Sequence, residues 1–295
     1  MWSAVTPRFR RFITNLQLSE AQRFDGLSKA RNVARKLNSE YFGDPDLGLG
    51  YYVYGSWGKG TAISPPYDVD MYYRVPIEEF ERFDRYAGNG QSGLLASVRE
   101  TLLDRYPQTR IRGDGQVVVI DFNSLTIEVA PCLERQNGSF LIPNSNQGGA
   151  WMVAEPRSEI SQLNYVDSIS NNNLRPLVQM AKQWKRHCNV PIKSFYIELL
   201  ATEYMRSCEW REQSLYYYDW IVRDFFQFLV NSPEKIVSVP YTEEIINVGS
   251  DWHSRSITAW ERAVSACEFE REDSIWSAGE CWQRIFGDKI PEYAA

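Results

Sequence analysis

Hydrophobic and polar residues repeat along this chain with two different periods, which predicts helices at both ends and strands between them. Apolar residues recur every three or four positions over residues 1–38, the spacing of helices with one buried face. Ser19 is followed three residues later by Gln22, a capping-box pair that predicts the start of a second helix. The helical spacing returns over 161–172, 174–187, 194–210, 215–230 and twice more after Asp251.

The middle of the chain has the composition of β-strands. Residues 116–122 and 125–130 are apolar, β-branched runs on either side of Asn123-Ser124, which predicts a hairpin. The polar stretch 132–149 is expected to be a loop that acts as a lid. Further strands are predicted over 51–54 and 67–73, and helices over 77–86 and 94–106.

Together these patterns predict an α+β fold with two domains. Residues 1–160 would form one mixed sheet with helices, the N-terminal helices included, and residues 161–295 would form an all-helical domain. A chain of 295 residues is long enough to bury a core in both.

Composition narrows the classes of function. The net charge of −6 argues against sequence-independent nucleic-acid binding, which needs a basic face, although a local basic cleft stays open. The five cysteines lack C-x-x-C spacing, so neither a disulfide framework nor a zinc site is indicated. No apolar run reaches about 18 residues and no signal-peptide pattern opens the chain, so we expect a cytoplasmic protein without a membrane partner.

Two carboxylates lie close together in the predicted strand 67–73. Asp68 and Asp70 are two residues apart, so their side chains point to the same face, while Val69 and Met71 point into a core. Neighbouring carboxylates repel each other unless one holds a proton or a cation lies between them. Mg²⁺ prefers oxygen ligands and commonly binds one or two carboxylates together with substrate phosphates. The pair therefore predicts a magnesium site.

A turn of small residues precedes the two acids. Gly55 permits close approach of the backbone to a ligand, Ser56 adds a hydroxyl, and Gly58–Thr61 adds backbone N–H groups, the Thr61 hydroxyl and the cation of Lys59. This pattern indicates a phosphate cradle. It is not a P-loop, because Gly60 follows Lys59 where Ser or Thr is required.

A third acidic ligand has two candidates in the predicted hairpin. Glu128 lies between Ile127 and Val129, and a carboxylate in so apolar a strand needs a partner. Asp121 has similar neighbours, Ile120 and Phe122. The residues alone leave both open.

Gly-Ser, a short loop and D-x-D in this order resemble the nucleotidyltransferase signature of the DNA polymerase β superfamily. The form found here, GSWGKGTAI…YDVDMYY, is similar to the bacterial cGAS/DncV-like nucleotidyltransferases. The resemblance implies attack of a ribose hydroxyl on the α-phosphate of an NTP with loss of pyrophosphate, and a second transfer that closes a ring. The product would be a cyclic di- or trinucleotide second messenger of anti-phage defence. Two Mg²⁺ ions, or Mn²⁺, would assist.

The resemblance also implies site residues. The family's third acid lies in the pattern apolar-acid-apolar-x-Pro, which residues 127–131 match with Glu128, although Asp is commoner there. This favours Glu128 over Asp121 as the third catalytic metal ligand beside Asp68 and Asp70. Gly55, Ser56 and Thr61 would bind the substrate.

The run from Leu174 to Glu198 resembles the family's helical-domain signature. In that family the helical domain closes the nucleotide cleft, and one lysine and one serine of the domain contact the triphosphate. By position these are Lys182 and Ser194, and Ser194 is expected as a helix N-cap. Phe195 would stack on a base or belong to the core.

Other functions use the same fold. A linear oligonucleotide synthase or a tRNA nucleotidyltransferase would keep the acids and add an acceptor groove. A non-catalytic nucleotide-binding protein would lose acids, whereas all are present here. The expected partners are NTP substrates, with a regulatory protein as a further option and no template nucleic acid.

Overall fold

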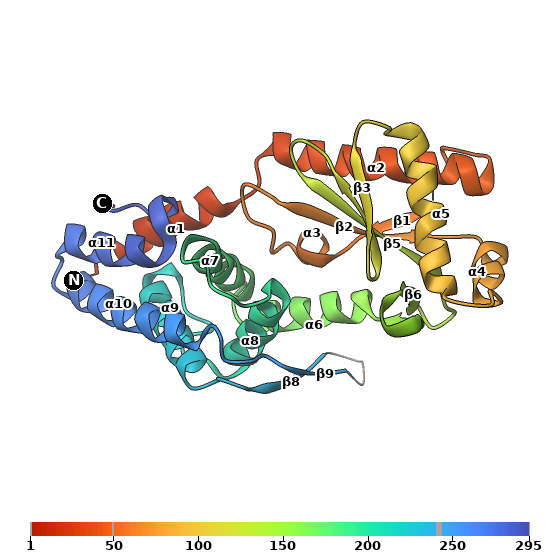
Figure 1. The fold of residues 1–295 in the computed structure, drawn as a ribbon. Helices are drawn as coiled ribbons and strands as arrows, with labels where there is room; N and C mark the ends of the chain where they lie inside the picture. The colour runs from red at the N-terminus through yellow and green to blue at the C-terminus, as the bar shows by residue number, and fades with distance from the viewer. Residues whose placement is uncertain (1, 49, 240–243, 295) are drawn as a thin grey trace. The chain divides into compact units, whose positions relative to one another are not determined.

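The computed structural model describes residues 2–48, 50–239 and 244–294, which form two compact units (Figure 1). One unit is Leu18–Ile160; the other joins Met1–Gln17 to Ser161–Ala295. The first 17 residues therefore belong with the helical unit and not with the sheet, contrary to the expected domain of residues 1–160. The reason is packing, because Phe9 and Phe12 are fully buried against Trp282 and Phe286, at ring-centroid distances of 5.3 and 4.8 Å.

The unit Leu18–Ile160 is built on a mixed seven-stranded sheet. Strands β2 and β5 run parallel, and every other pair in the sheet is antiparallel. The order is β1-β2-β5-β4-β3, with β6 between β5 and β7. The strands are β1 (Tyr51–Val53), β2 (Asp68–Arg74), β3 (Arg110–Asp114), β4 (Val117–Asp121), β5 (Thr126–Glu134), β6 (Phe140–Asn144) and β7 (Ala150–Ala154). The predicted α+β class and the hairpin about Asn123-Ser124 are confirmed.

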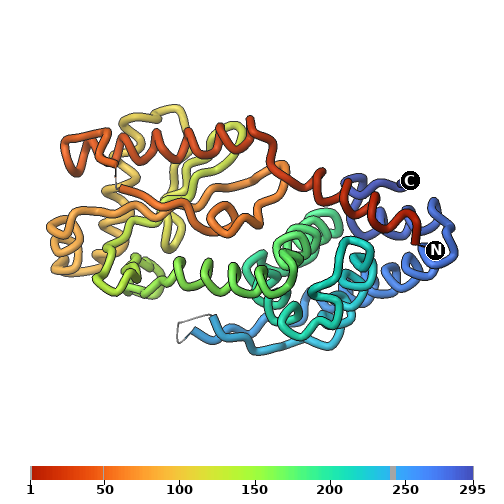
Figure 2. The backbone as a smooth tube through the Cα atoms, turned by 180° about the vertical axis from the view of Figure 1, so that it is seen from behind, coloured from red at the N-terminus to blue at the C-terminus, as the bar shows by residue number. Residues whose placement is uncertain are grey.

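One face of this sheet carries the unit's main core. Inward-facing residues of β2, β4 and β5 pack against apolar residues of α2 (Glu20–Phe42) and α5 (Gly90–Arg105), and Figure 2 shows α2 running alongside the strands. Helix α2 begins with the predicted capping box of Ser19 and Gln22. The other helices wholly within the unit are α3 (Gly55–Lys59) and α4 (Ile77–Asp84), and η1 (Asn146–Gly148) is a short 3₁₀ turn.

The prediction that residues 132–149 form one loop is wrong for residues 132–134 and 140–144, which lie in strands, while 135–139 and 145–149 are turns as expected. Strand β5 continues to Glu134, and residues 140–144 form β6, which pairs with β5 and with β7. Phe140 and Ile142 are buried in a second, smaller core on the other face of the sheet. The prediction failed because β6 is short and flanked by Asn, Gln and Gly, so its alternation is hidden among turn residues.

The second unit is helical, as predicted, with one exception. Helix α7 has the predicted bounds, while β8 (Ile236–Ser238) and β9 (Ile245–Asn247) pair as antiparallel strands where only helix was expected. No helix in the described ranges is long and apolar enough to cross a membrane. The helices, with α6 beginning in the other unit, are α1 (Val5–Leu16), α6 (Pro156–Ile169), α7 (Leu174–His187), α8 (Ser194–Ser207), α9 (Tyr218–Val230), α10 (His253–Arg271) and α11 (Ile275–Phe286), with 3₁₀ turns η2 (Leu215–Tyr217) and η3 (Gly287–Lys289).

Candidate functional site

The parallel pairing of β2 with β5 places three carboxylates on one face of the sheet. Asp70 lies opposite Glu128 in the register, and Asp68 lies opposite Thr126. Residues opposite each other on neighbouring strands share a face and are about 5 Å apart. Val69 and Met71, between and after the two aspartates, are fully buried in the core on the other face. The alternation predicted for β2 is therefore present, with Asp68 and Asp70 on one face and apolar residues on the other.

Burial and mutual repulsion shape the electrostatics of this face. Burial raises the pKa of Glu128, and the negative charge of Asp68 raises it further. Burial also raises the pKa of the Tyr54 hydroxyl, with added contributions from Tyr72, Asp70 and Glu128. A hard divalent cation would relieve the repulsion among the carboxylates.

The donor set fits such a cation in its chemistry, because all three side chains offer carboxylate oxygens. In the described part of the chain, however, no three His, Cys, Asp or Glu side chains converge as a complete metal site. The backbone thus brings the acids onto adjacent strands, while their side chains are not closed around a point.

The Gly-Ser turn packs and hydrogen-bonds directly against β2, the strand that carries Asp68 and Asp70. Gly55 and Ser56 begin the one-turn helix α3, and Gly55 has a φ of +57°. A Cβ atom on Gly55 would lie 1.8 Å from Oδ2 of Asp70, so only glycine lets this carboxylate rest against the turn. The Tyr54 N–H donates to the carbonyl of Asp70 at 3.0 Å, and Trp57 Nε1 donates to the carbonyl of Asp68 at 2.7 Å.

Gly55→Ala is expected to reduce the activity that the signature implies, nucleotidyl transfer, at least tenfold, because the new methyl group must displace the Asp70 carboxylate. Gly43→Ala is the matched control, since Gly43 also has a positive φ, +70°, but nothing lies within 4 Å of its added Cβ. Both variants should lose about 1–2 kcal/mol of unfolding free energy from the left-handed backbone. Only Gly55→Ala should lose activity; equal activities of the two folded variants would show that the close contact is unimportant.

Other residues of the predicted phosphate cradle face inward. Thr61 has no exposed surface and its N–H donates to the carbonyl of Ser56 at 2.8 Å, so it closes the turn and is not placed to contact a substrate. Lys59 is also buried, with its ammonium 2.6 Å from Glu159. Gly55 and Ser56 keep part of their surface exposed. The cradle is thus smaller than the sequence suggested.

The helical unit holds Lys182 in a buried ion pair. Its Nζ donates to Oε1 of Glu198 at 2.6 Å, and the two side chains are only 7 and 8% exposed. This excludes the simplest alternative for a helical lysine, a side chain in bulk water. A buried pair of this kind is costly to break from one side, because the remaining charge is left uncompensated.

A second lysine reaches the start of α8. Lys185 Nζ donates to the Ser194 hydroxyl at 3.1 Å. Ser194 is the first residue of α8, and the N-cap position belongs to Lys193, so the predicted N-cap role is off by one residue. Phe195 is partly exposed next to it. The arrangement gathers a hydroxyl and a cation at the N-terminal turn of a helix.

The sequence did not indicate three residues that lie beside the predicted site residues. Tyr54 lies near the acids, and Glu198 and Lys185 contact Lys182 and Ser194. The available signal was spacing, since Lys185 follows Lys182 by three residues and so lies on the neighbouring position of the same helix. The pairing of Lys182 with Glu198 joins two helices and had no local signal.

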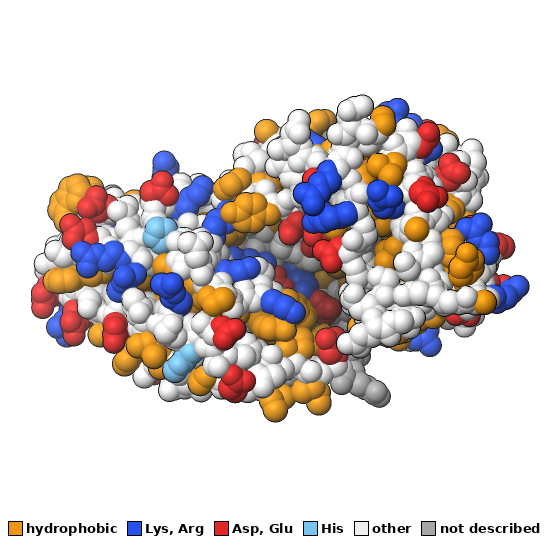
Figure 3. Space-filling view, viewed as in Figure 1, with side chains coloured by type: hydrophobic (Ala, Val, Ile, Leu, Met, Phe, Trp, Pro, Cys, Tyr) orange, Lys and Arg blue, Asp and Glu red, His pale blue; other side chains and the backbone are white. Residues whose placement is uncertain are grey.

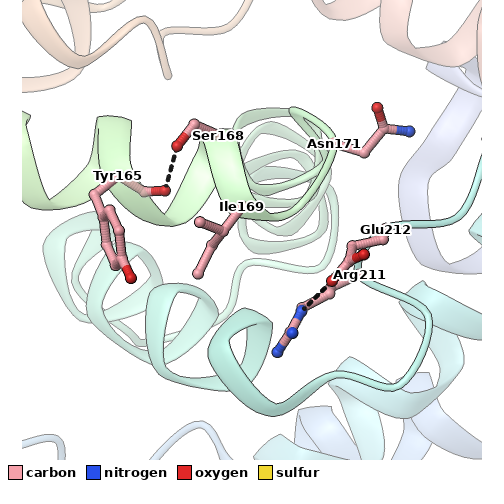
Figure 4. A pocket seen from close by; sticks show the side chains of 6 residues that line it. All are labelled: Tyr165, Ser168, Ile169, Asn171, Arg211 and Glu212. Atoms are coloured by element: carbon pink, nitrogen blue, oxygen red, sulfur yellow. Dashed lines mark hydrogen bonds and ion pairs between the residues drawn. The ribbon is translucent and has the colours of Figure 1, made fainter.

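An open polar pocket of about 700 Å³ lies elsewhere on the helical unit (Figure 4). The Ser168 hydroxyl donates to the carbonyl of Tyr165 at 2.7 Å, and Arg211 Nε donates to Glu212 at 3.1 Å. None of the predicted site residues lines it. Its lining residues are Tyr165, Ser168, Ile169, Asn171, Arg211 and Glu212.

Comparison with known proteins agrees with the signature read from the sequence. The family model of the Second Messenger Oligonucleotide or Dinucleotide Synthetase domain (SMODS) matches residues 4–166. A cyclic AMP-AMP-AMP synthase of an Acinetobacter species is 21% identical over 285 residues, which cover 91% of this chain and 80% of the relative.

Two solved structures share the fold. Vibrio cholerae DncV cyclic AMP-GMP synthase, in complex with the linear intermediate 5′ pppA(3′,5′)pG, has a TM-score of 0.76 at 13% identity, covering 97% of this chain and 96% of that one. CdnC of E. coli MS115-1, solved with ATP, has a TM-score of 0.69 at 16% identity, covering 98 and 99%. The chain therefore belongs to the Second Messenger Oligonucleotide or Dinucleotide Synthetase family, the cGAS/DncV-like nucleotidyltransferases that its Gly-Ser and D-x-D signature resembles.

Proposed function

We propose that this protein is a metal-dependent nucleotidyltransferase that joins NTPs into a cyclic di- or trinucleotide. The observation that carries the proposal is the pairing of β2 with β5, which sets Asp70 beside Glu128 and Asp68 beside Thr126 on one face. The Gly-Ser turn supports it, because Gly55 lies directly against Asp70. Family membership supplies the class of reaction.

In the proposed reaction, Asp68, Asp70 and Glu128 hold divalent cations, Mg²⁺ or Mn²⁺. Two such ions would stabilise the attacking and leaving oxygens of an in-line transfer. Ser56 and the backbone of the Gly55 turn would hold phosphate oxygens beside the acids. Tyr54 lies next to the same acids and would limit the access of water to them. The reacting ribose hydroxyl would attack the α-phosphate, and pyrophosphate would leave.

We further propose that Lys182 and Ser194 of the helical unit bind the triphosphate, joined by Lys185. Lys185 already donates to Ser194 at 3.1 Å, so a phosphate oxygen could share that cation with the hydroxyl. Phe195 beside them would contact the base. Thr61 is left out of this set because its side chain is buried.

Incubating the protein with all four radiolabelled NTPs and Mg²⁺ or Mn²⁺ tests the proposal. We expect pyrophosphate release that depends on the metal and on the nucleotide. A protein that binds NTPs but releases no pyrophosphate with any metal or nucleotide would instead be the non-catalytic alternative.

The contribution of Lys182 can be measured with a charge-neutral double variant. Lys182→Ala alone would strand buried Glu198 and cost about 3–5 kcal/mol of unfolding free energy. Lys182→Met/Glu198→Gln removes both charges, should stay folded, and should raise the KM for NTP about ten- to a hundredfold, because one charge-assisted phosphate contact contributes about 1.5–3 kcal/mol. The kcat should change less, since the contact is made in both ground and transition states.

The control for this variant is Lys235→Met/Glu203→Gln, which removes another ion pair of the same unit, 2.9 Å long and more exposed. Its KM should equal that of the wild type. An unchanged KM in the folded Lys182→Met/Glu198→Gln protein would assign Lys182 to structure alone.

A role in anti-phage signalling and control by a partner protein complete the proposal. A second structure of E. coli MS115-1 CdnC is a complex with HORMA-deltaN, which supports a regulatory protein as the kind of partner to seek. A cytoplasmic location also remains a proposal, in keeping with five cysteines that are all free thiols.

A further inference from the structure

Asp121, the rival candidate for the third acid, is held by two arginines of the edge strand β3. Arg112 Nη1 lies 2.7 Å from Oδ2 of Asp121, and Arg110 Nε lies 3.9 Å from the same oxygen. The other oxygen, Oδ1, accepts a hydrogen bond of 3.4 Å from the Thr126 hydroxyl. Both carboxylate oxygens of Asp121 therefore have partners within the sheet. The presence of two arginines on this strand then needs an explanation of its own.

The strand register places the arginines on the same face as the acids. One row of paired residues crosses β2, β5, β4 and β3 and consists of Asp70, Glu128, Val119 and Arg112. At about 4.8 Å between neighbouring strands, the backbone of Arg112 is about 10 Å from that of Glu128.

The next row of the same face also begins with an aspartate on β2 and ends with an arginine on β3. Asp68, Thr126, Asp121 and Arg110 lie opposite one another. Figure 3, drawn in the view of Figure 1, shows Lys and Arg side chains beside Asp and Glu side chains over the strands of this unit. One face therefore carries carboxylates on its central strands and guanidinium groups at its edge, with Asp114 as a further acid on β3.

Charged residues on an edge strand have a simpler explanation. They prevent another chain from pairing with the exposed strand, and the side chains of Arg110 and Arg112 are 77 and 42% exposed. Protection of the edge requires charge but does not require that a carboxylate hold both guanidinium groups together. The contact of 2.7 Å with Asp121 orders the Arg112 side chain, so less side-chain entropy is lost when its guanidinium group binds an anion.

We propose that Arg110 and Arg112 bind the 5′-triphosphate of the acceptor nucleotide, and that Asp121 is the residue that positions them. The inference rests on the proposed function, in which the acceptor's ribose hydroxyl must reach the acids. An acceptor NTP brings its own triphosphate to a face with three carboxylates, which repel it. Guanidinium groups bind phosphate oxygens bidentately. Strand β3 lies two strands from β5, so these groups are on the same face as the acids and to one side of them.

The roles of donor and acceptor can be separated by using a donor nucleotide that has no hydroxyl group to accept a second nucleotide. A 2′,3′-dideoxynucleoside triphosphate lacks both ribose hydroxyls, so it can only donate. With each of the four dideoxy donors at saturation, the acceptor is given as a ribonucleoside or as its 5′-triphosphate, and the mixed product is measured over a range of acceptor concentrations.

Arg110→Ala/Arg112→Ala is expected to raise the KM for the triphosphate acceptor about ten- to thirtyfold and to leave the KM for the nucleoside acceptor unchanged. The factor corresponds to two charge-assisted contacts reduced by solvent exposure. Asp121→Asn, which keeps both arginines but weakens their anchor, should raise the same KM by a smaller factor and serves if the double variant does not fold. Arg82→Ala/Arg85→Ala on α4, which removes two arginines of similar exposure, should change neither KM.

Equal increases for both acceptors, or none for the triphosphate, would overturn the proposal. If the wild type transfers from no donor to any acceptor, the proposed function itself is wrong. Calorimetry with inorganic tripolyphosphate in metal-free buffer then tests the subsite alone. Weaker binding by Arg110→Ala/Arg112→Ala than by Arg82→Ala/Arg85→Ala supports it, and equal binding contradicts it.

Discussion

Replacing Asp68 and Asp70 together by asparagine is expected to abolish product formation while the protein stays folded. Asparagine keeps the shape of each side chain, so the contact of residue 70 with Gly55 and the burial of Val69 and Met71 are preserved. Both charges are lost, however, and with them the ligands that divalent cations require. We expect a fall in kcat of several orders of magnitude.

The stability of the same variant separates a catalytic role from a structural one. Because the carboxylates repel one another in the metal-free protein, removing two of them should leave the unfolding temperature unchanged or raise it slightly. Added Mg²⁺ should stabilise the wild type and not the variant, since a ligand that binds only the folded state raises its stability. Wild-type levels of product from the double variant would refute the assignment of the acids.

Glu128→Gln is expected to reduce kcat far more than Asp121→Asn. Glu128 lies opposite Asp70 in the register, whereas Asp121 lies opposite Thr126 and is 2.7 Å from an arginine. Displacing a metal that activates the nucleophile costs orders of magnitude in a two-metal reaction. Asp121→Asn should act mainly on the KM of the acceptor.

Steady-state kinetics of the two variants decide between these carboxylates. Both changes are isosteric, and neither residue belongs to the buried core, so both proteins should remain folded. A Glu128→Gln protein with full kcat beside an inactive Asp121→Asn protein would exchange the two roles.

Local patterns in the sequence predicted the parts of the site that local geometry decides. The period of two in β2 sets Asp68 and Asp70 on one face, and the hairpin about Asn123-Ser124 brings Glu128 into the sheet. Helix α7 has the predicted bounds because its apolar residues recur with a clear helical spacing. Such features depend on neighbours in sequence and so can be read from it.

Contacts between distant segments could not be predicted in this way. Glu198 holds Lys182 and Glu159 holds Lys59, and each pair joins separate elements of the fold. Helix α1 packs beside α7, α9 and η2, about 150 residues or more away, because its apolar face fits there and not because of any local signal. The short strand β6 is flanked by turn residues, so its alternation does not stand out, whereas β4 of the same length lies in an apolar, β-branched run.

The product itself tests the central claim most directly. Wild-type protein is incubated with labelled NTPs and Mg²⁺, the mixture is treated with phosphatase, and the surviving nucleotide is analysed by mass spectrometry. A cyclic di- or trinucleotide has no terminal phosphate, so we predict a product that resists phosphatase. Its mass should equal two or three nucleoside monophosphates less one water for each linkage. The Asp68→Asn/Asp70→Asn variant should make none of it. A product that phosphatase shortens to a linear oligonucleotide with free ends would contradict ring closure and identify a linear synthase.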